Sequence, residues 1–179
     1  LFLGVAPAVL LGACGGGGGA GPAPVGSIAP PPAPAAVQIP AASFDTAEYR
    51  RSNAAVAAGA ISAWTSGADG AGVVIGFVDS GIDTASPEFA GRISSASRDV
   101  TGGGRSVADA DGHGTAVVAV AAAARDSGAI TGVAPAATIA AMRADQPGSC
   151  ATDCSFAGSA IGAGIDAAVA AGARIVSLS

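Results

Sequence analysis

The sequence predicts an α/β fold, namely a doubly wound parallel sheet with flanking helices. After residue 70, short apolar runs rich in β-branched residues alternate with Ala-rich stretches of helical length. This alternation is typical of strands joined by right-handed helical crossovers, which makes the strands parallel. Half of the 179 residues are hydrophobic and only 4% are aromatic. Small aliphatic side chains therefore supply most of the core, as expected for helices packed closely on a buried sheet.

The predicted elements follow one another along the chain. We expect one helix from Thr46 to Trp64, because its apolar positions fall at helical spacing and Asp45 stands where a cap is needed. The run Val73–Val78 is continuously apolar and β-branched, which is typical of a strand buried on both faces. The remaining predicted elements are the helices His113–Ala124 and Ser159–Ala171 and the strands Thr138–Met142 and Arg174–Leu178.

The amino-terminal segment is expected to precede the folded domain. Leu1–Leu11 is an apolar run too short to span a bilayer but suited to the core of a signal peptide. It leads into Leu-Gly-Ala-Cys14, which is similar to the lipobox of bacterial lipoproteins and makes Cys14 a candidate for lipidation. An ordinary signal peptide, cut near an alanine, is the alternative. We predict a signal peptide and lipobox over residues 1–14, a Gly- and Pro-rich linker over 15–43 and a folded domain over 44–179.

The charge balance argues against a nucleic-acid partner. The eight basic residues are all Arg, they face thirteen acidic residues, and they form no cluster in the sequence. Such a chain offers no basic surface to a phosphate backbone. The apolar amino terminus instead indicates export, to a secreted form or to the cell surface or outer membrane of a Gram-negative type of cell through a lipid anchor at Cys14.

Cys150 and Cys154 are expected to form a disulfide. Three residues separate them, and in an oxidising compartment this spacing is typical of a small disulfide loop. A metal pair is the alternative, but the chain has a single His and no third Cys nearby to complete the ligands.

Three motifs carry the chemistry of the chain. In the first motif, Val74–Asp83, an apolar strand ends at Asp79. In the second, Asp111–Thr115, His113 stands between two glycines. The third, Gly132–Pro135, has the sequence Gly-Val-Ala-Pro. In this order they resemble the subtilisin-like (S8) serine peptidases, whose triad runs Asp, His, Ser along the chain. The similarity covers roughly residues 46–179. It implies that the folded domain is the amino-terminal part of an S8 peptidase domain, with a subtilisin-like fold incomplete at its C-terminal end.

Asp79 and His113 are the candidate catalytic residues. A serine hydroxyl is a poor nucleophile until a neutral imidazole takes its proton, and His113 is the only imidazole in the chain. A buried carboxylate must fix the tautomer of that ring, and Asp79 follows a strand whose end is suited to the role. Considered alone, Asp79 matches an ordinary turn residue and His113 matches an ordinary helix cap. The two motifs together favour a catalytic role.

The resemblance implies further features of the protein. The nucleophile motif Gly-Thr-Ser and the Asn that stabilises the oxyanion are expected beyond Ser179, so that this fragment alone is inactive and the complete protein is a serine endopeptidase of proteins or peptides. Ser177 and Ser179 match the strand that enters the substrate-binding edge of the family. The lipobox, the linker and the helix before the first strand resemble the autotransporter and lipoprotein-type branch.

The reaction requires no cofactor, although members of the resembling family often bind calcium. Glu88, within Pro-Glu-Phe, falls where the family has a calcium ligand, and Asp126 lies near a second such position. A calcium ion takes about six to eight oxygens, and the sequence indicates only these two residues.

Two other classes of function match parts of the sequence. A phosphate-binding module would use the glycines at 70 and 72, but a dinucleotide site needs its glycines after the first strand rather than before it. A catalytically dead subtilisin-like scaffold or adhesin would lack the serine. The intact pair of Asp79 and His113 argues against that loss, and the downstream sequence decides it.

Overall fold

The computed structural model describes residues 39–179, all of which belong to one compact unit, Ala36–Ser179. The predictions for Cys14, the signal peptide and most of the linker lie outside the described residues. The helices are α1 (Ala47–Arg51), α2 (Asn53–Ala57), α3 (Ala60–Trp64), α4 (His113–Ala122) and α5 (Gly158–Ala170). The strands are β1 (Val74–Asp79), β2 (Arg98–Asp99), β3 (Thr138–Arg143) and β4 (Ala173–Leu178).

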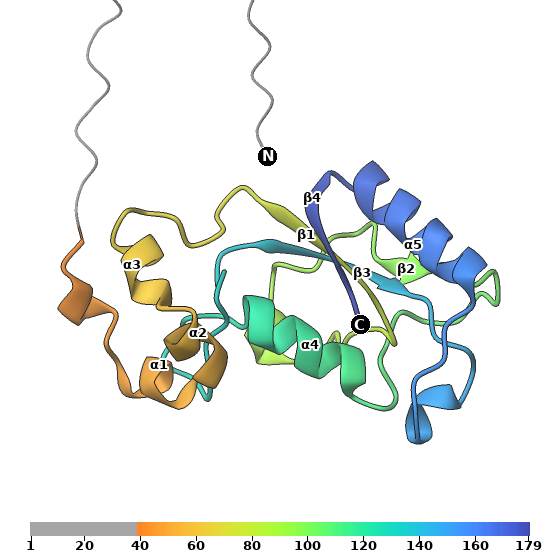
Figure 1. Cartoon of the computed structure of the whole chain (residues 1–179), viewed down its shortest axis with the longest axis horizontal. Helices are drawn as coiled ribbons and strands as arrows, with labels where there is room; N and C mark the ends of the chain where they lie inside the picture. The colour runs from red at the N-terminus through yellow and green to blue at the C-terminus, as the bar shows by residue number, and fades with distance from the viewer. Residues whose placement is uncertain (1–38) are drawn as a thin grey trace, which may run out of the picture. The chain divides into compact units, whose positions relative to one another are not determined.

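The four strands form one all-parallel sheet in the order β2-β3-β1-β4. The chain leaves β1, forms the edge strand β2, returns through α4 to β3, and then crosses through α5 to β4 on the other side of β1. In Figure 1, α4 and α5 lie on opposite faces of the sheet. This arrangement confirms the predicted doubly wound α/β class.

The face of the sheet that packs on α4 holds the larger apolar side chains. Ile75 and Phe77 of β1 alternate along the strand and contact Ile139 of β3 and Val118 of α4 within one buried cluster. Alternate residues of a strand point to the same face, so these contacts fix which face α4 covers. Full burial of each such side chain contributes roughly 1.5–3 kcal/mol.

The opposite face packs on α5 through small residues. Val78 of β1 and Met142 of β3 contact Ala167 and Ala168 of α5, and all four are buried. The backbones approach closely here, because a Cβ added at Gly164 of α5 would lie 2.6 Å from Cγ1 of Val78. Such close packing leaves little room for large aromatic side chains, which is consistent with the low aromatic content of the chain.

The segment predicted as one helix from Thr46 to Trp64 is instead three short helices. The first break is at Ser52, whose hydroxyl donates to the Glu48 carbonyl and accepts from the Thr131 N–H, so that tertiary contacts turn the chain. The second is at Gly59, whose φ of 62° favours glycine and ends α2.

The predicted cap of the first helix is also wrong. Thr46, rather than Asp45, caps α1, because its side chain accepts a hydrogen bond from the Tyr49 N–H at 3.1 Å. Asp45 forms an exposed ion pair with Arg50 instead. The three helices still bury Trp64 as expected, against Phe44 and Tyr49, and the indole N–H donates to the Val133 carbonyl at 2.9 Å.

The sequence did not predict every element. Strand β2 has only two residues, and the 3-10 helices Ala41–Ser43, Pro87–Phe89 and Ser149–Ala151 have three residues each. Elements of this length are too short to show an apolar period. Within residues 39–179, no helix combines the length and apolar character that crossing a membrane requires.

Two glycines of α5 provide a matched test of the packing. We expect Gly164→Ala to lower the free energy of unfolding by about 1–3 kcal/mol, because the new Cβ would overlap Val78 in the core. Gly162→Ala, where a Cβ meets no atom within 4 Å, should raise it by up to about 1 kcal/mol through helix propensity. Urea unfolding of both variants measures the difference, and equal effects would contradict this account of the packing.

Candidate active site

Asp79 occupies the carboxyl end of β1, and its side chain is only 2% exposed. The Oδ1 atom lies 2.7 Å from Nδ1 of His113 and accepts a second hydrogen bond, also at 2.7 Å, from the Ser80 N–H. The backbone of Asp79 is held as well, because its carbonyl accepts from the Ala144 N–H at 2.8 Å. The carboxylate is thus buried in a fixed orientation, directed at the imidazole.

His113 is the first residue of α4, and 45% of its side chain is exposed. Gly112 precedes it with a φ of 90°, a conformation that favours glycine and turns the chain into the helix. A Cβ at Gly114 would lie 2.3 Å from the Gly81 carbonyl oxygen and 3.1 Å from Oδ1 of Asp79. Gly114 is therefore needed for the helix to approach the end of β1, and Gly112 for the turn that leads into the helix.

Asp109 holds the start of α4. Its Oδ2 atom accepts from the N–H and the hydroxyl of Thr115, at 2.8 and 2.7 Å. Its Oδ1 atom accepts from the Ser80 hydroxyl and from the Gly112 N–H, both at 3.0 Å. Asp109 was not identified from the sequence, and its position four residues before His113 was the only signal available.

The environment of Asp109 favours its ionised form. Partial burial by itself raises the pKa of a carboxyl group, but the hydrogen bonds from Thr115, Gly112 and Ser80 outweigh burial, and the pKa of Asp109 is lowered. These bonds also occupy Ser80, whose hydroxyl donates to Asp109 and accepts from the Gly114 N–H at 2.9 Å. Ser80 therefore links β1 to α4.

The Asp79–His113 contact defines what the ring can do. An ionised carboxylate only accepts hydrogen bonds, so the proton of the neutral ring belongs on Nδ1, next to Asp79. Nε2 then keeps its lone pair and is available as a base. A buried carboxylate that orients a half-exposed imidazole is the arrangement that hydrolases use to activate a hydroxyl nucleophile.

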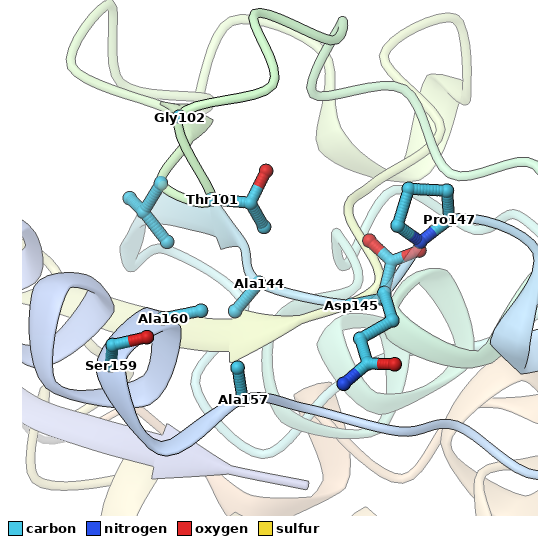
Figure 2. A pocket seen from close by; sticks show the side chains of 10 residues that line it. Thr101, Gly102, Ala144, Asp145, Pro147, Ala157, Ser159 and Ala160 are labelled. Carbon is cyan, nitrogen blue, oxygen red and sulfur yellow. The ribbon is translucent and has the colours of Figure 1, made fainter.

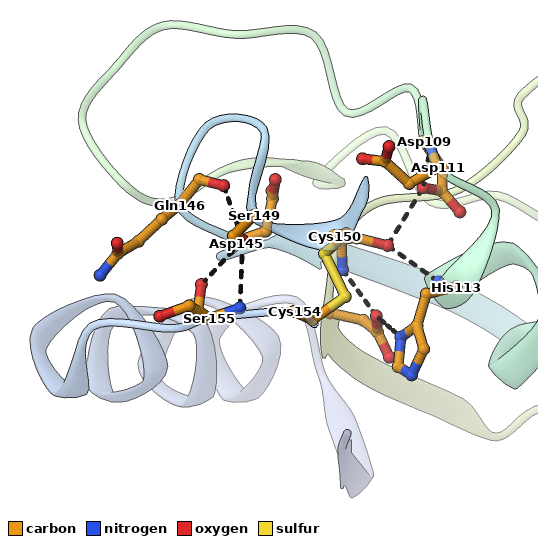
Figure 3. The surroundings of a disulfide bond; sticks show 12 residues. Asp109, Asp111, His113, Asp145, Gln146, Ser149, Cys150, Cys154 and Ser155 are labelled. Atoms are coloured by element: carbon orange, nitrogen blue, oxygen red, sulfur yellow. Dashed lines mark hydrogen bonds and ion pairs between the residues drawn. A yellow bond between two sulfur atoms is a disulfide. The ribbon is translucent and has the colours of Figure 1, made fainter. Parts of the chain in front are cut away.

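The predicted pair Cys150 and Cys154 is bridged in the structure. The bridge closes the loop between β3 and α5, and hydrogen bonds between Gln146, Ser149 and Ser155 support the same loop. Figure 3 draws His113 and Asp109 among the residues that surround this disulfide.

A pocket of about 320 Å³ lies at the carboxyl end of the sheet. Figure 2 shows that the chain after β2, the chain after β3 and the start of α5 enclose it. Most of its lining is small or apolar, and the lining residues are Val100, Thr101, Gly102, Ala144, Asp145, Gln146, Pro147, Ala157, Ser159 and Ala160.

The predicted substrate-binding serines lie at the same end of the sheet. Ser177 belongs to β4 and pairs in register with Phe77 of β1, two residues before Asp79. Ser177 is half-buried, and Ser179 follows the strand and is exposed.

The predicted calcium ligands Glu88 and Asp126 lie near each other, close to a third acid, Glu48. Burial and then the nearby charges of Asp126 and Glu48 raise the pKa of Glu88, and its Oε2 atom is buried without a hydrogen-bond partner among residues 39–179. Oε1 of Glu48 is occupied by the N–H groups of Asp126 and Gly128. In this part of the chain, no group of three or more His, Cys, Asp and Glu side chains is arranged to hold a metal ion.

The fold and the site together define the class of the protein. A doubly wound parallel sheet delivers an acid at the end of one strand to a histidine at the start of the following helix, as in hydrolases that use an Asp-His-Ser triad. Comparison with protein-family models matches residues 70–179 to the subtilase family, Peptidase S8. The chain belongs to the subtilase family, which implies a serine peptidase that acts on protein substrates.

Replacing Asp109 with Asn tests its role at the start of α4. Because the folded state lowers the pKa of Asp109, its ionised form stabilises the fold at neutral pH, and this contribution is lost as the pH falls through the ordinary carboxyl range and below it. We expect Asp109→Asn to lower the free energy of unfolding by about 1–3 kcal/mol at pH 7, and by progressively less below about pH 4. Asp111→Asn is the control, and equal effects of the two substitutions would contradict the assignment.

Proposed function

We propose that Asp79 and His113 are the acid and the base of an Asp-His-Ser triad in a serine endopeptidase. The observation that carries the proposal is the 2.7 Å contact between Nδ1 of His113 and Oδ1 of the buried Asp79. Membership of the subtilase family supports it, because the family implies a serine-type peptidase. In this proposal, a segment of the protein that follows Ser179 supplies the serine.

Each residue has a defined step in the proposed mechanism. Nε2 of His113 takes the proton from the serine hydroxyl as the oxygen bonds to the scissile carbonyl carbon, and the ring becomes an imidazolium. Asp79 stabilises that positive charge and keeps the ring in its orientation. The imidazolium then gives the proton to the leaving amine as the peptide C–N bond breaks. A water molecule releases the acyl group by the same steps, which restores the serine.

The proposed substrate site lies beside the pair. The edge that ends at Ser177 and Ser179 presents backbone groups to which an extended peptide can pair as an added strand. The pocket lined by Val100, Ala157 and Ala160 lies at the same end of the sheet and suits one apolar side chain of the substrate.

We further propose that the protein acts outside the cytoplasm, secreted or anchored at an outer membrane through Cys14, in the manner of the autotransporter and lipoprotein-type branch. The disulfide between Cys150 and Cys154 supports an oxidising compartment. The alternative is a scaffold or adhesin that retains the fold without activity, and the test of His113 below separates the two.

Calcium is a proposed ligand rather than a participant in catalysis. The Oε2 atom of Glu88, which has no partner among residues 39–179, and the nearby Asp126 fit a hard cation, which would offset the burial and the repulsion that raise the pKa of Glu88. Oε1 of the third acid, Glu48, is occupied by the N–H groups of Asp126 and Gly128, so backbone oxygens would have to complete the ligands.

His113→Ala tests the proposed function in the full-length protein. We expect peptide hydrolysis to slow by roughly 10⁴-fold or more, because the proton transfer is lost. The free energy of unfolding should change by no more than about 1 kcal/mol, since a half-exposed side chain contributes little packing. Activity of the variant within tenfold of the parent would refute the role of His113, and an inactive parent would favour the scaffold.

Calcium titration with thermal unfolding tests the proposed ligand. We expect calcium to raise the Tm of the parent but not that of Glu88→Gln. Without calcium, Glu88→Gln should be the more stable protein near neutral pH, because the folded state raises the pKa of Glu88 and so disfavours its charge. Asp153→Asn, an exposed carboxylate elsewhere, is the control, and an equal calcium response in all three proteins would rule out the site.

A further inference from the structure

A buried ionic network lies beside the catalytic candidates. Arg143, at the end of β3, pairs in register with Asp79 of β1, and its side chain is directed toward Asp145. Its Nε atom donates to Oδ1 of Asp145 at 2.8 Å and its Nη2 atom to Oδ2 at 3.3 Å. Asp145 is fully buried, and the guanidinium binds it through two parallel hydrogen bonds.

The remaining nitrogen of Arg143 reaches the loop that leads to α4. Nη1 donates to the carbonyl oxygens of Ser106 and Ala108. Arg105, in the same loop, also binds Asp145, with Nη1 at 3.1 Å from Oδ2. The loop is therefore attached to the end of β3 at three residues within four positions.

Asp99 secures the beginning of this loop. Its carboxylate accepts from the Arg105 N–H at 2.9 Å and from the N–H and hydroxyl of Thr101. These hydrogen bonds outweigh the effect of burial and, with the charge of Arg105, hold the pKa of Asp99 at about 2. The attachment therefore persists across the ordinary pH range.

The loop positions the histidine through one residue. Ala108, whose carbonyl accepts from Arg143, is directly followed by Asp109, which holds the start of α4 through Thr115 and Gly112. The Asp109 N–H also donates to the Ile82 carbonyl at 3.1 Å, so the loop runs along the chain that leaves β1. A chain of contacts thus connects Arg143 to His113.

We propose that Arg143 and Asp145 are positioning residues that set the orientation of His113 toward Asp79 by fixing the loop before α4. This inference rests on the proposed function, since it assigns a role within the same site. A buried ion network is weak evidence for stability, because well-packed apolar residues of similar volume are often as stable. The network instead attaches the loop in one precise geometry, which apolar residues would not do.

Two variants separate positioning from stability in the full-length protein. Arg143→Lys keeps the charge beside Asp145 but not the geometry that binds Asp145 and two carbonyls together. The double variant Arg143→Met with Asp145→Leu removes both charges of the pair and leaves Arg105 with Asp99 as its ion partner, so it should unfold at a Tm close to that of the parent. We expect kcat to fall by about tenfold to a hundredfold in both variants, because the reacting groups are misaligned. KM should stay within about twofold in Arg143→Lys, which keeps the pocket residue Asp145. Arg98→Lys, the same change at an exposed arginine of β2, should alter neither constant.

The signal of the His113 Nδ1–H in proton NMR provides a readout independent of turnover. It is identified by its absence in His113→Ala, and we expect it to shift or broaden in Arg143→Lys but not in Arg98→Lys. An unchanged signal, or a kcat within twofold of the parent in the folded variants, overturns the inference. An inactive parent overturns the proposed function instead, and the NMR comparison then decides the positioning role by itself.

Discussion

The contact between the Asp79 carboxylate and the His113 ring is the interaction around which the structure is organised. The two groups differ sharply in environment, because the Asp79 side chain is 2% exposed and that of His113 is 45% exposed. A buried charge is costly unless hydrogen bonds compensate for it. Here the Ser80 N–H and the imidazole both bind Oδ1 of Asp79, while Oδ2 is buried without a partner among residues 39–179. The open side of the ring remains free for a reaction, so the acid is held in place while the base stays accessible.

Close approach of the layers makes this contact possible. Helix α4 reaches the end of β1 only because Gly114 has no side chain to meet the Gly81 carbonyl and Asp79. On the other face, Gly164 admits Val78 in the same way. Small residues of the helices therefore allow the close approach that brings the polar groups at the strand ends next to the helices.

The sequence predicted the parts of the fold whose pattern is long and local. The strand at Val73–Val78 and the helix at His113 were recognised from continuous apolar runs, and their order predicted a parallel sheet. The break at Ser52 was missed because it depends on Thr131, which lies 79 residues away along the chain. A single-sequence pattern contains no information about such a partner.

The sequence likewise predicted only part of the candidate site. The residues placed together by the motifs, Asp79 and His113, are in hydrogen-bond contact, whereas the supporting residues carry no motif of their own. Arg143 follows the predicted strand Thr138–Met142, and nothing local indicates that its guanidinium reaches Asp145 and the loop. Contacts between side chains on separate loops become visible only in three dimensions.

The acids near the site differ in how completely their charges are compensated, and this difference separates their roles. Asp99 and Asp109 accept several hydrogen bonds each, and their pKa values are lowered. Glu88 has the opposite shift, because burial and two neighbouring acids raise its pKa and one of its oxygens has no partner among residues 39–179. Folding alone therefore satisfies the acids that build the loop before His113, while Glu88 keeps an unmet need for a proton or a cation. Asp99 and Asp109 are thus well compensated on the loop before α4, whereas Oδ2 of Asp79 and Oε2 of Glu88 are buried without a partner among residues 39–179.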